Sequence, residues 1–251
     1  MVGPVAGLRP CRGLADVNVD VFIPAAAWDD EERVAARRWV TSWWTVHGHT
    51  PTLCVTAEQP WRKGAAVNDA ITASTADVIV IADADSWMRP ASIDRMLHHA
   101  GSGRWVVPFG QVRRLDPDST RAALAADPAT IVDPDWQVLA QRPHDALPGG
   151  GIIAAPRHLW EQVGGFDPRF ADWGGEDYAL GCALHTMADR DAKRMTGPLW
   201  HLWHRPQSNV RAESPATSAL AFRYRKAKYR RPDMEALLAE WRPQPWHQAT
   251  S

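Results

Sequence analysis

Two carboxylates directly follow the most apolar strand-length segment of the sequence. Asp83 and Asp85 stand one residue apart after the β-branched run VIVIA at 78–82. Like charges this close repel each other unless a cation lies beside them. Carboxylate oxygens suit Mg²⁺ or Mn²⁺, and such ions commonly bridge to phosphates. The pattern indicates a divalent-cation site for a phosphorylated substrate, although the same spacing also occurs in loops where water solvates both acids.

A second acidic pair, Glu176 and Asp177, follows Gly174 and Gly175. Consecutive glycines let the chain turn tightly and let a ligand approach the backbone. The two acids then fall in the first turn of a helix expected over 176–187, where the helix dipole favours their ionised form. An ionised carboxylate can accept a proton from an attacking hydroxyl group, so the pair is a candidate general base. Helix capping is the alternative interpretation.

Two histidines, His201 and His204, stand beside Trp200 and Trp203 late in the chain. Imidazole can complete the coordination sphere of Mn²⁺, although a single histidine is more often a hydrogen-bonded structural residue. Side chains alternate along an extended segment, so we expect the two histidines on opposite faces and only one of them in a site.

A glycine run at 149–151 opens a short strand expected over 151–155. Gly150 would permit the close approach of a sugar ring, and a flexible hinge is the alternative. These glycines precede a strand instead of following one, so they do not form a dinucleotide-binding loop. Phosphate-loop and nucleophile-elbow motifs are also missing from the sequence, which argues against a P-loop NTPase and a serine hydrolase.

The elements that must position these residues alternate between strand and helix. Strand, helix, strand, helix and strand are expected at 19–24, 29–44, 52–56, 64–74 and 78–82. This order predicts an α/β fold with a parallel sheet, in which ligands bind outside the carboxyl ends of the strands. Asp83 and Asp85 lie at such an end.

The rest of the chain is less regular. Residues 111–147 are polar and rich in Pro and Asp, so we expect a long loop with helical pieces that closes over a substrate together with 205–215. Further expected elements are strands at 104–109, 151–155 and 199–203, helices at 156–163 and 176–187, and one or two helices over 216–241.

Composition limits the functional classes. The 251 residues suffice for a buried core, and a net charge of −1 argues against binding of nucleic acid through a broad positively charged surface. No run of 18 apolar residues and no signal peptide is present, and the three cysteines fit a reducing compartment, so we expect a cytoplasmic protein without a membrane anchor. Tryptophan is in excess, with 14 residues. The candidates for stacking on a ring are Trp28, Trp87, Trp173, Trp200 and Trp203.

Taken together, these motifs resemble those of GT-A fold glycosyltransferases of the family 2 type. The first half carries VDVFIP, KGAAVNDAI and VIVIADAD in the order of that family. The later segment GGGIIAAPRHLWEQVGGFDPRFADWGGEDYAL resembles the β-1,4-galactosyltransferase and chondroitin-synthase-like enzymes, and LWHLWH resembles their late metal-binding histidine. The resemblance spans about residues 18–206.

The resemblance implies roles for residues of this sequence. The metal, Mn²⁺ or Mg²⁺, would be held by Asp83, Asp85 and His201, with His204 as the second choice. Asp177 would be the catalytic base, and Glu176 would hold or orient the acceptor. The other implied donor-binding residues are Pro24, Ala25, Lys63 and Asn68. The acceptor side would consist of Trp173, Gly174, Gly175, Glu176 and Gly150.

The resemblance also implies a fold and a domain plan. The fold would be a mixed, mostly parallel sheet flanked by helices. A flexible lead-in would occupy residues 1–17, the glycosyltransferase domain 18–210, and a C-terminal helical extension 211–251.

The implied activity is the inverting, metal-dependent transfer of a hexose (Gal, Glc or an N-acetylhexosamine) from a UDP-sugar to a hydroxyl group of a glycan, a protein or hydroxymethylated DNA. One alternative is a sugar nucleotidyltransferase, which would need a glycine-rich loop where this chain has AAAWDD. The other is a non-catalytic sugar-binding module, which has no use for both acidic motifs and a late histidine. The basic cluster at 223–231 is either a solvated helix face or a contact for a polyanionic acceptor.

Overall fold

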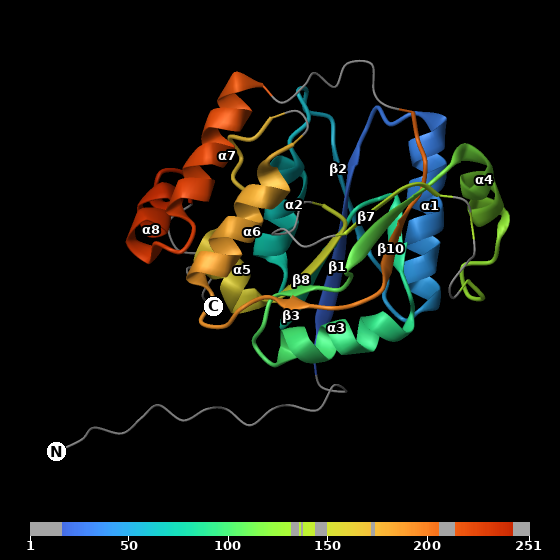
Figure 1. The fold of residues 1–251 in the computed structure, drawn as a ribbon, viewed down its shortest axis with the longest axis horizontal. Coiled ribbons are helices and arrows are strands. Elements are labelled where there is room, and N and C mark those ends of the chain that lie inside the picture. Colours follow the sequence, from blue (N-terminus) through green and yellow to red (C-terminus); the bar gives the residue numbers. More distant parts are fainter. Residues whose placement is uncertain are drawn as a thin grey trace.

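The computed structural model of this chain describes residues 17–131, 136, 138–143, 150–171, 174–205 and 214–242 (Figure 1). The first half contains β1 (Val19–Ala26), α1 (Glu31–Val46), β2 (Thr52–Thr56), α2 (Lys63–Ala73), β3 (Val78–Ala82), β4 (Ser86–Met88), α3 (Ala91–Gly101), β5 (Val106–Val107), β6 (Gln111–Leu115) and α4 (Pro117–Ala125). The second half contains β7 (Val138–Pro143), β8 (Ile152–Pro156), α5 (Arg157–Val163), α6 (Glu176–Met187), β9 (Lys193–Arg194), β10 (Pro198–His201), α7 (Pro215–Ala227) and α8 (Arg231–Ala239).

A six-stranded sheet in the order β2-β1-β3-β8-β5-β9 forms the centre of the fold. Strand β1 pairs in parallel with both β2 and β3, whereas β8 runs antiparallel to β3 and β5. The predicted mixed, mostly parallel sheet flanked by helices is therefore confirmed. The carboxyl ends of β1 and β3 lie at the same edge of this sheet, because parallel strands end on the same side.

A second sheet has four strands in the order β4-β10-β6-β7. The prediction of a long loop over 111–147 is wrong for the described part, since β6 and β7 pair with each other and α4 lies between them. The polar sequence of β6 gives no strand signal of its own. Its pairing with β10 on one side and β7 on the other stabilises it, and such tertiary pairing outweighs local preference.

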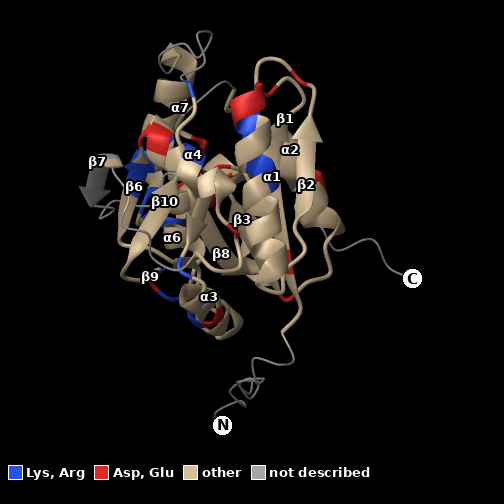
Figure 2. Ribbon diagram, turned by 90° about the vertical axis from the view of Figure 1, so that its right-hand side faces the viewer, with Lys and Arg blue, Asp and Glu red and all other residues tan. Residues whose placement is uncertain are grey.

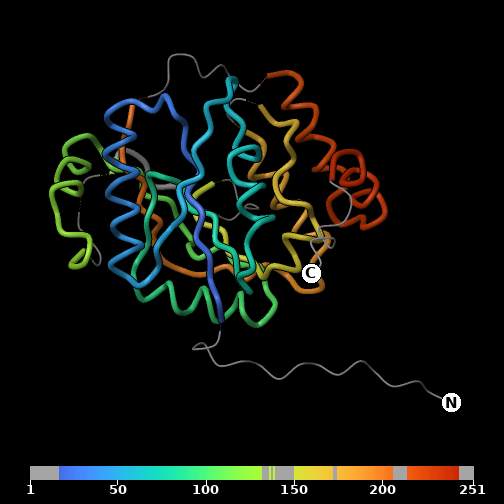
Figure 3. Tube along the Cα trace, turned by 180° about the vertical axis from the view of Figure 1, so that it is seen from behind, coloured from blue at the N-terminus to red at the C-terminus, as the bar shows by residue number. Residues whose placement is uncertain are grey.

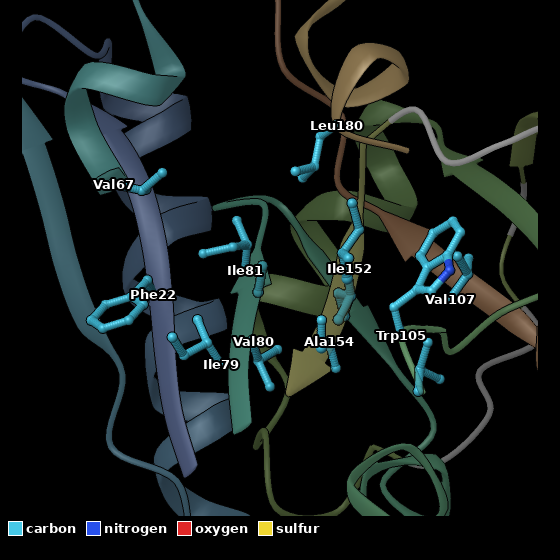
Figure 4. Packing of buried hydrophobic residues seen from close by; sticks show 14 of the residues in the cluster. Phe22, Val67, Ile79, Val80, Ile81, Trp105, Val107, Ile152, Ala154 and Leu180 are labelled. Atoms are coloured by element: carbon cyan, nitrogen blue, oxygen red, sulfur yellow. The ribbon is translucent and has the colours of Figure 1, made fainter. Parts of the chain in front are cut away.

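The core lies around β3, of which all five residues are buried. Figure 4 shows Ile79 and Ile81 of this strand beside Phe22 of β1 and Ile152 of β8, with Leu180 of α6 above them. Seven of the 14 tryptophans are also buried in this core.

The indole rings of Trp87 and Trp200 are 0% and 1% exposed. They stack on each other at a centroid distance of 6.1 Å. Neither ring is free to stack on a sugar, contrary to the expectation from their positions near strand ends.

The C-terminal helices α7 and α8 pack against α6 and against each other, at the end of the molecule opposite α1 and α4 (Figure 3). A buried carboxylate, Asp167 in the loop before α6, also holds α7 through Tyr224. It accepts hydrogen bonds from the hydroxyl group of Tyr224 at 2.9 Å and from the guanidinium of Arg169 at 2.7 Å. Among the described helices, none combines the length and apolar character needed to cross a bilayer.

Candidate functional site

A turn between the two sheets carries the first acidic motif. Strand β3 ends at Ala82 and β4 begins at Ser86, so Asp83 and Asp85 lie between the sheets. The backbone N–H of Asp83 donates to the carbonyl of Gly151 at 2.8 Å, and the carbonyl of Asp85 accepts from the N–H of Leu202 at 2.8 Å. The two acids are thereby held against different parts of the fold, and their side chains have different partners.

The carboxylate of Asp83 faces α2 and α6. Its Oδ1 accepts from Lys63 Nζ at 2.8 Å, and its Oδ2 accepts from the backbone N–H of Gly151 at 2.6 Å. The same ammonium group donates to Oδ1 of Asp177 at 2.8 Å. Lys63 therefore joins the first acidic motif to the second.

Lys63 is an unusual first residue for a helix, because its side chain is 8% exposed and points into the fold. Burial by itself would lower the pKa of this ammonium group, but the charges of Asp177 and Asp83 outweigh that effect and raise the pKa. Lys63 is thus held as a cation between two acids.

The second acidic motif forms the first turn of α6, as the sequence predicts. Gly175 precedes it with a φ of +85°, a backbone conformation that favours glycine. Burial raises the pKa of Asp177, while the neighbouring Lys63 opposes that rise. Burial, together with the charge of Asp177, raises the pKa of Glu176 to about 7, and Oε2 of Glu176 is buried without a hydrogen-bond partner among the described residues. The two adjacent acids therefore differ, because Asp177 is paired with Lys63 and Glu176 has no cationic partner among the described residues.

The second aspartate of the turn, Asp85, lies with both histidines. Its Oδ2 is 3.1 Å from Nε2 of His204 and 3.5 Å from Nε2 of His201. The expectation that only one histidine enters a site is not met. Strand β10 ends at His201, so the alternation of side chains stops there and both rings reach the same carboxylate.

The donor atoms of this cluster fit a divalent transition-metal ion. Nδ1 of His201 lies 2.7 Å from the carbonyl oxygen of Leu202, so Nδ1 carries the proton and Nε2 keeps its lone pair. Burial lowers the pKa of His201, which also favours the neutral ring. Burial would raise the pKa of Asp85, but its contacts with the two histidines, including a hydrogen bond from His204, outweigh burial and lower the pKa, so its carboxylate is ionised. One carboxylate and two imidazoles suit Mn²⁺ better than Mg²⁺, which prefers oxygen ligands only.

Two arginines adjoin this cluster, and neither was expected from the sequence. Nη1 of Arg114 lies 3.0 Å from Nε2 of His201. Nη2 of Arg33 lies 2.9 Å from Nδ1 of His204 and 2.7 Å from the carbonyl of Arg205. Arg114 lies in a segment that was expected to be a loop, and Arg33 looks like an ordinary helix residue, so no sequence signal marked them.

The remaining expected donor and acceptor residues are divided between the site and the scaffold. An ideal Cβ at Gly150, which has a φ of +71°, would lie 3.2 Å from Oδ2 of Asp83 and 3.4 Å from Oδ2 of Asp177. Gly150 therefore lies directly against both acids. Gly174 and Gly175 form the turn that leads into α6, and Trp173 lies outside the described residues.

The expected nucleotide contacts lie mostly in the scaffold. The side-chain amide of Asn68 donates to the carbonyl of Phe166 at 2.8 Å and accepts from its N–H at 3.0 Å. Both of its amide atoms thus hold the loop before α6. Pro24 and Ala25 are buried near the carboxyl end of β1, paired with Cys54 and Val55 of β2.

The basic cluster at 223–231 has mostly structural contacts. Tyr224 and Ala227 are buried against the fold. Three of its arginines form ion pairs with acids, namely Arg223 with Glu240, Arg230 with Asp233 and Arg231 with Asp189. These contacts favour a solvated helix face over a continuous surface for a polyanion.

Comparison with known families gives two matches, which overlap over residues 140–147. The family described as glycosyl transferase family 2 matches residues 46–147. The family described as the N-terminal domain of galactosyltransferase matches residues 140–185. Between them they include both acidic motifs, Lys63 and Gly150. No curated protein matches the chain significantly in sequence.

Solved structures share the fold at low sequence identity. Glucosyl-3-phosphoglycerate synthase from Mycobacterium tuberculosis, in complex with Mn²⁺, UDP-glucose and phosphoglyceric acid, is 15% identical with a TM-score of 0.50, over 88% of this chain and 86% of that one. The catalytic domain of Drosophila β1,4-galactosyltransferase 7, in complex with xylobiose, is 14% identical with a TM-score of 0.49, over 80% of this chain and 77% of that one.

Proposed function

We propose that this chain, which is a glycosyltransferase of the GT-A fold, transfers a hexose from a UDP-sugar to an acceptor hydroxyl group and inverts the anomeric configuration. The observation that carries the proposal is the position of Asp177, which Lys63 holds at 2.8 Å opposite Asp83, the residue that begins the turn to the Asp85 and histidine cluster. The proposed base and the proposed cation site therefore adjoin the same turn, 83–85. The synthase from Mycobacterium tuberculosis, whose structure contains UDP-glucose and Mn²⁺, supports this choice of donor.

Asp85, His201 and His204 would hold a divalent cation in this proposal. When bound, the cation would neutralise charge that develops on the diphosphate as it leaves the sugar. The residues of the chain fit this role, because Asp85 is ionised and the tautomer of His201 leaves Nε2 available as a ligand.

Asp177 is the proposed general base. Its Oδ1 is engaged by Lys63, and Gly150 leaves room beside its Oδ2, where a side chain would otherwise lie within 3.4 Å. An acceptor hydroxyl group placed there would give its proton to Asp177 as its oxygen attacks the anomeric carbon. Glu176, with a pKa raised to about 7, would orient the acceptor by a hydrogen bond.

This arrangement of groups supports the inversion that we propose. A carboxylate that accepts the proton of the acceptor supports one direct displacement, in which the carbon–oxygen bond to the acceptor forms as the bond to the UDP oxygen breaks. The proton ends on Asp177 and the electron pair on the diphosphate. Neither a covalent sugar intermediate nor a nucleophilic side chain is required.

The test is a panel of UDP-Gal, UDP-Glc, UDP-GlcNAc and UDP-GalNAc, with GDP-mannose for comparison, offered with glycan, protein and hydroxymethylated-DNA acceptors. UDP release and the mass of the product are measured in Mn²⁺ and in EDTA, and NMR gives the anomeric configuration of the product. We expect transfer from one UDP-sugar, its loss in EDTA, and a β-linked product from an α-linked donor. Asp177→Asn is expected to lower kcat by about 100-fold or more, the range for a lost general base.

Several outcomes would overturn the proposal. Transfer that is insensitive to EDTA would show that the reaction needs no cation. Full activity of Asp177→Asn would show that Asp177 is not the base. Retention of the anomeric configuration would rule out a single displacement. Binding of free sugar without UDP would instead favour the non-catalytic module.

A further inference from the structure

We infer that Arg114 binds the diphosphate of the donor, using a guanidinium group that contacts His201 in this structure. The inference rests on the proposed function and extends it to a residue outside the acidic motifs. It follows from three features of the structure: the lone pair of His201, the position of Arg114, and the contacts of the other cations.

The first feature is that Nε2 of His201 can bind either the guanidinium group of Arg114 or a cation. Because the Leu202 carbonyl oxygen lies 2.7 Å from Nδ1 of His201, the proton is on Nδ1 and Nε2 has a single lone pair. That lone pair now accepts from Nη1 of Arg114 at 3.0 Å. It is also the only atom through which His201 can join the cation site. A cation ligated there would therefore displace the guanidinium group and leave it beside the site.

The second feature is the way in which the backbone aims Arg114. It lies directly opposite His201 in the parallel pairing of β6 with β10. The pairing of β6 with β7 is irregular between Arg114 and Leu115, and irregularities of this kind re-aim side chains next to active sites. Figure 2 shows basic residues on β6 beside β10. Arg113, one residue earlier, lies instead over the ring of Trp200, 4.9 Å from its centroid.

The third feature is that the two other cations that contact the acids and histidines of the site, Lys63 and Arg33, have acidic partners. Lys63 is bound by Asp83 and Asp177, and Arg33 pairs with Asp30. Within the part of the chain that the structure describes, Arg114 forms no ion pair with a carboxylate, and its contact is with His201. A guanidinium group presents two parallel N–H donors that match two phosphate oxygens, so a diphosphate beside the cation is the ligand that it fits.

The experiment compares UDP with uridine, which lacks the phosphates. Calorimetry measures the affinity of each in saturating Mn²⁺, and a separate titration measures Mn²⁺ alone, for the unmodified chain, Arg114→Gln, Arg114→Lys and the neighbouring control Arg113→Gln. We expect Arg114→Gln to weaken UDP by about 10-fold or more, as for the loss of a charge-assisted hydrogen bond, with uridine unchanged. The UDP affinity of Arg114→Lys should lie between those of Arg114→Gln and the unmodified chain, because lysine keeps the charge but lacks the two parallel N–H donors. Arg113→Gln should match the unmodified chain.

The Mn²⁺ titration separates a ligand-binding role from a structural one. If Arg114 competes for the lone pair, Arg114→Gln binds Mn²⁺ at least as tightly as the unmodified chain. Weaker Mn²⁺ binding would mean that Arg114 positions His201, and would overturn the inference. Unchanged UDP affinity, or an equal loss for uridine, would also overturn it while leaving the proposed function intact. If the unmodified chain binds no UDP in Mn²⁺, the proposed function and the role of Arg114 fail together.

Discussion

The ammonium nitrogen of Lys63 lies 2.8 Å from Oδ1 of Asp177, although the two residues are 114 positions apart in the chain. Lys63 is the first residue of α2, and Asp177 lies in the first turn of α6. The same ammonium group also holds Asp83, which follows β3. One buried cation therefore fixes the relative positions of a helix start and a strand end, and it lies between two acids that would otherwise repel each other.

Removing this cation is expected to destabilise the protein. Lys63→Met leaves Asp83 and Asp177 without their shared partner, and breaking a buried pair in this way costs about 3 kcal/mol of unfolding free energy. Urea unfolding in EDTA measures the change. The double variant Lys63→Met/Asp177→Asn should recover part of the loss, because only one charge is then left unpaired. Stability of Lys63→Met equal to that of the unmodified chain would contradict the buried ion pair.

Stability should fall with rising pH because of Glu176. Its pKa is raised from 4.5 to about 7, so the native state holds the proton more tightly than the unfolded chain does. The contribution of protonated Glu176 to the free energy of unfolding is therefore full below about pH 4.5 and is lost as the pH rises through about 7. Thermal unfolding of the metal-free protein from pH 5 to 8 should show a shallower decline in Glu176→Gln. The exposed Glu235→Gln on α8 is the control, and identical slopes for all three proteins would refute the prediction.

The central fold could be predicted because its signals are local. The β-branched run of β3 and the alternation of strands and helices before it are properties of short segments, and they predict the parallel sheet that β2, β1 and β3 form. The acidic motif of α6 was likewise found from its glycines and its place in a first turn. These features depend on neighbours in sequence, so sequence reasoning reaches them.

The parts of the site that could not be predicted depend on contacts between distant segments. Strand β6 is polar and becomes a strand only by pairing with β10, so Arg114 was hidden in an expected loop. His204 was expected on the face opposite His201, and the end of β10 at His201 brings it to the same carboxylate. No sequence signal indicated that the amide of Asn68 holds the backbone of Phe166. In each case a tertiary contact outweighed a local pattern.

Metal affinity should distinguish the two aspartates of the turn. Asp85 lies with both histidines, whereas Asp83 is engaged by Lys63 and by the N–H of Gly151. Asp85→Asn, His201→Ala and His204→Ala should each weaken Mn²⁺ binding by more than about 10-fold, since even outer-sphere partners of a metal cost that much. Asp83→Asn, measured without nucleotide, should stay within a few-fold of the unmodified chain. A loss in Asp83→Asn as large as in Asp85→Asn would return Asp83 to the ligand set that the sequence suggests.

A methyl group at Gly150 should damage the site more than the fold. The added Cβ would lie 3.2 Å from Oδ2 of Asp83 and 3.4 Å from Oδ2 of Asp177, in the space proposed for the acceptor oxygen. The positive φ of +71° adds about 1–2 kcal/mol of backbone strain. Gly48→Ala is a matched control, because its φ is +89° and no atom lies within 4 Å of the new Cβ. Both variants should lose similar unfolding free energy, whereas only Gly150→Ala should lose kcat with the identified donor and acceptor. Equal kcat in the two variants would show that Oδ2 of Asp177 is not where the acceptor binds.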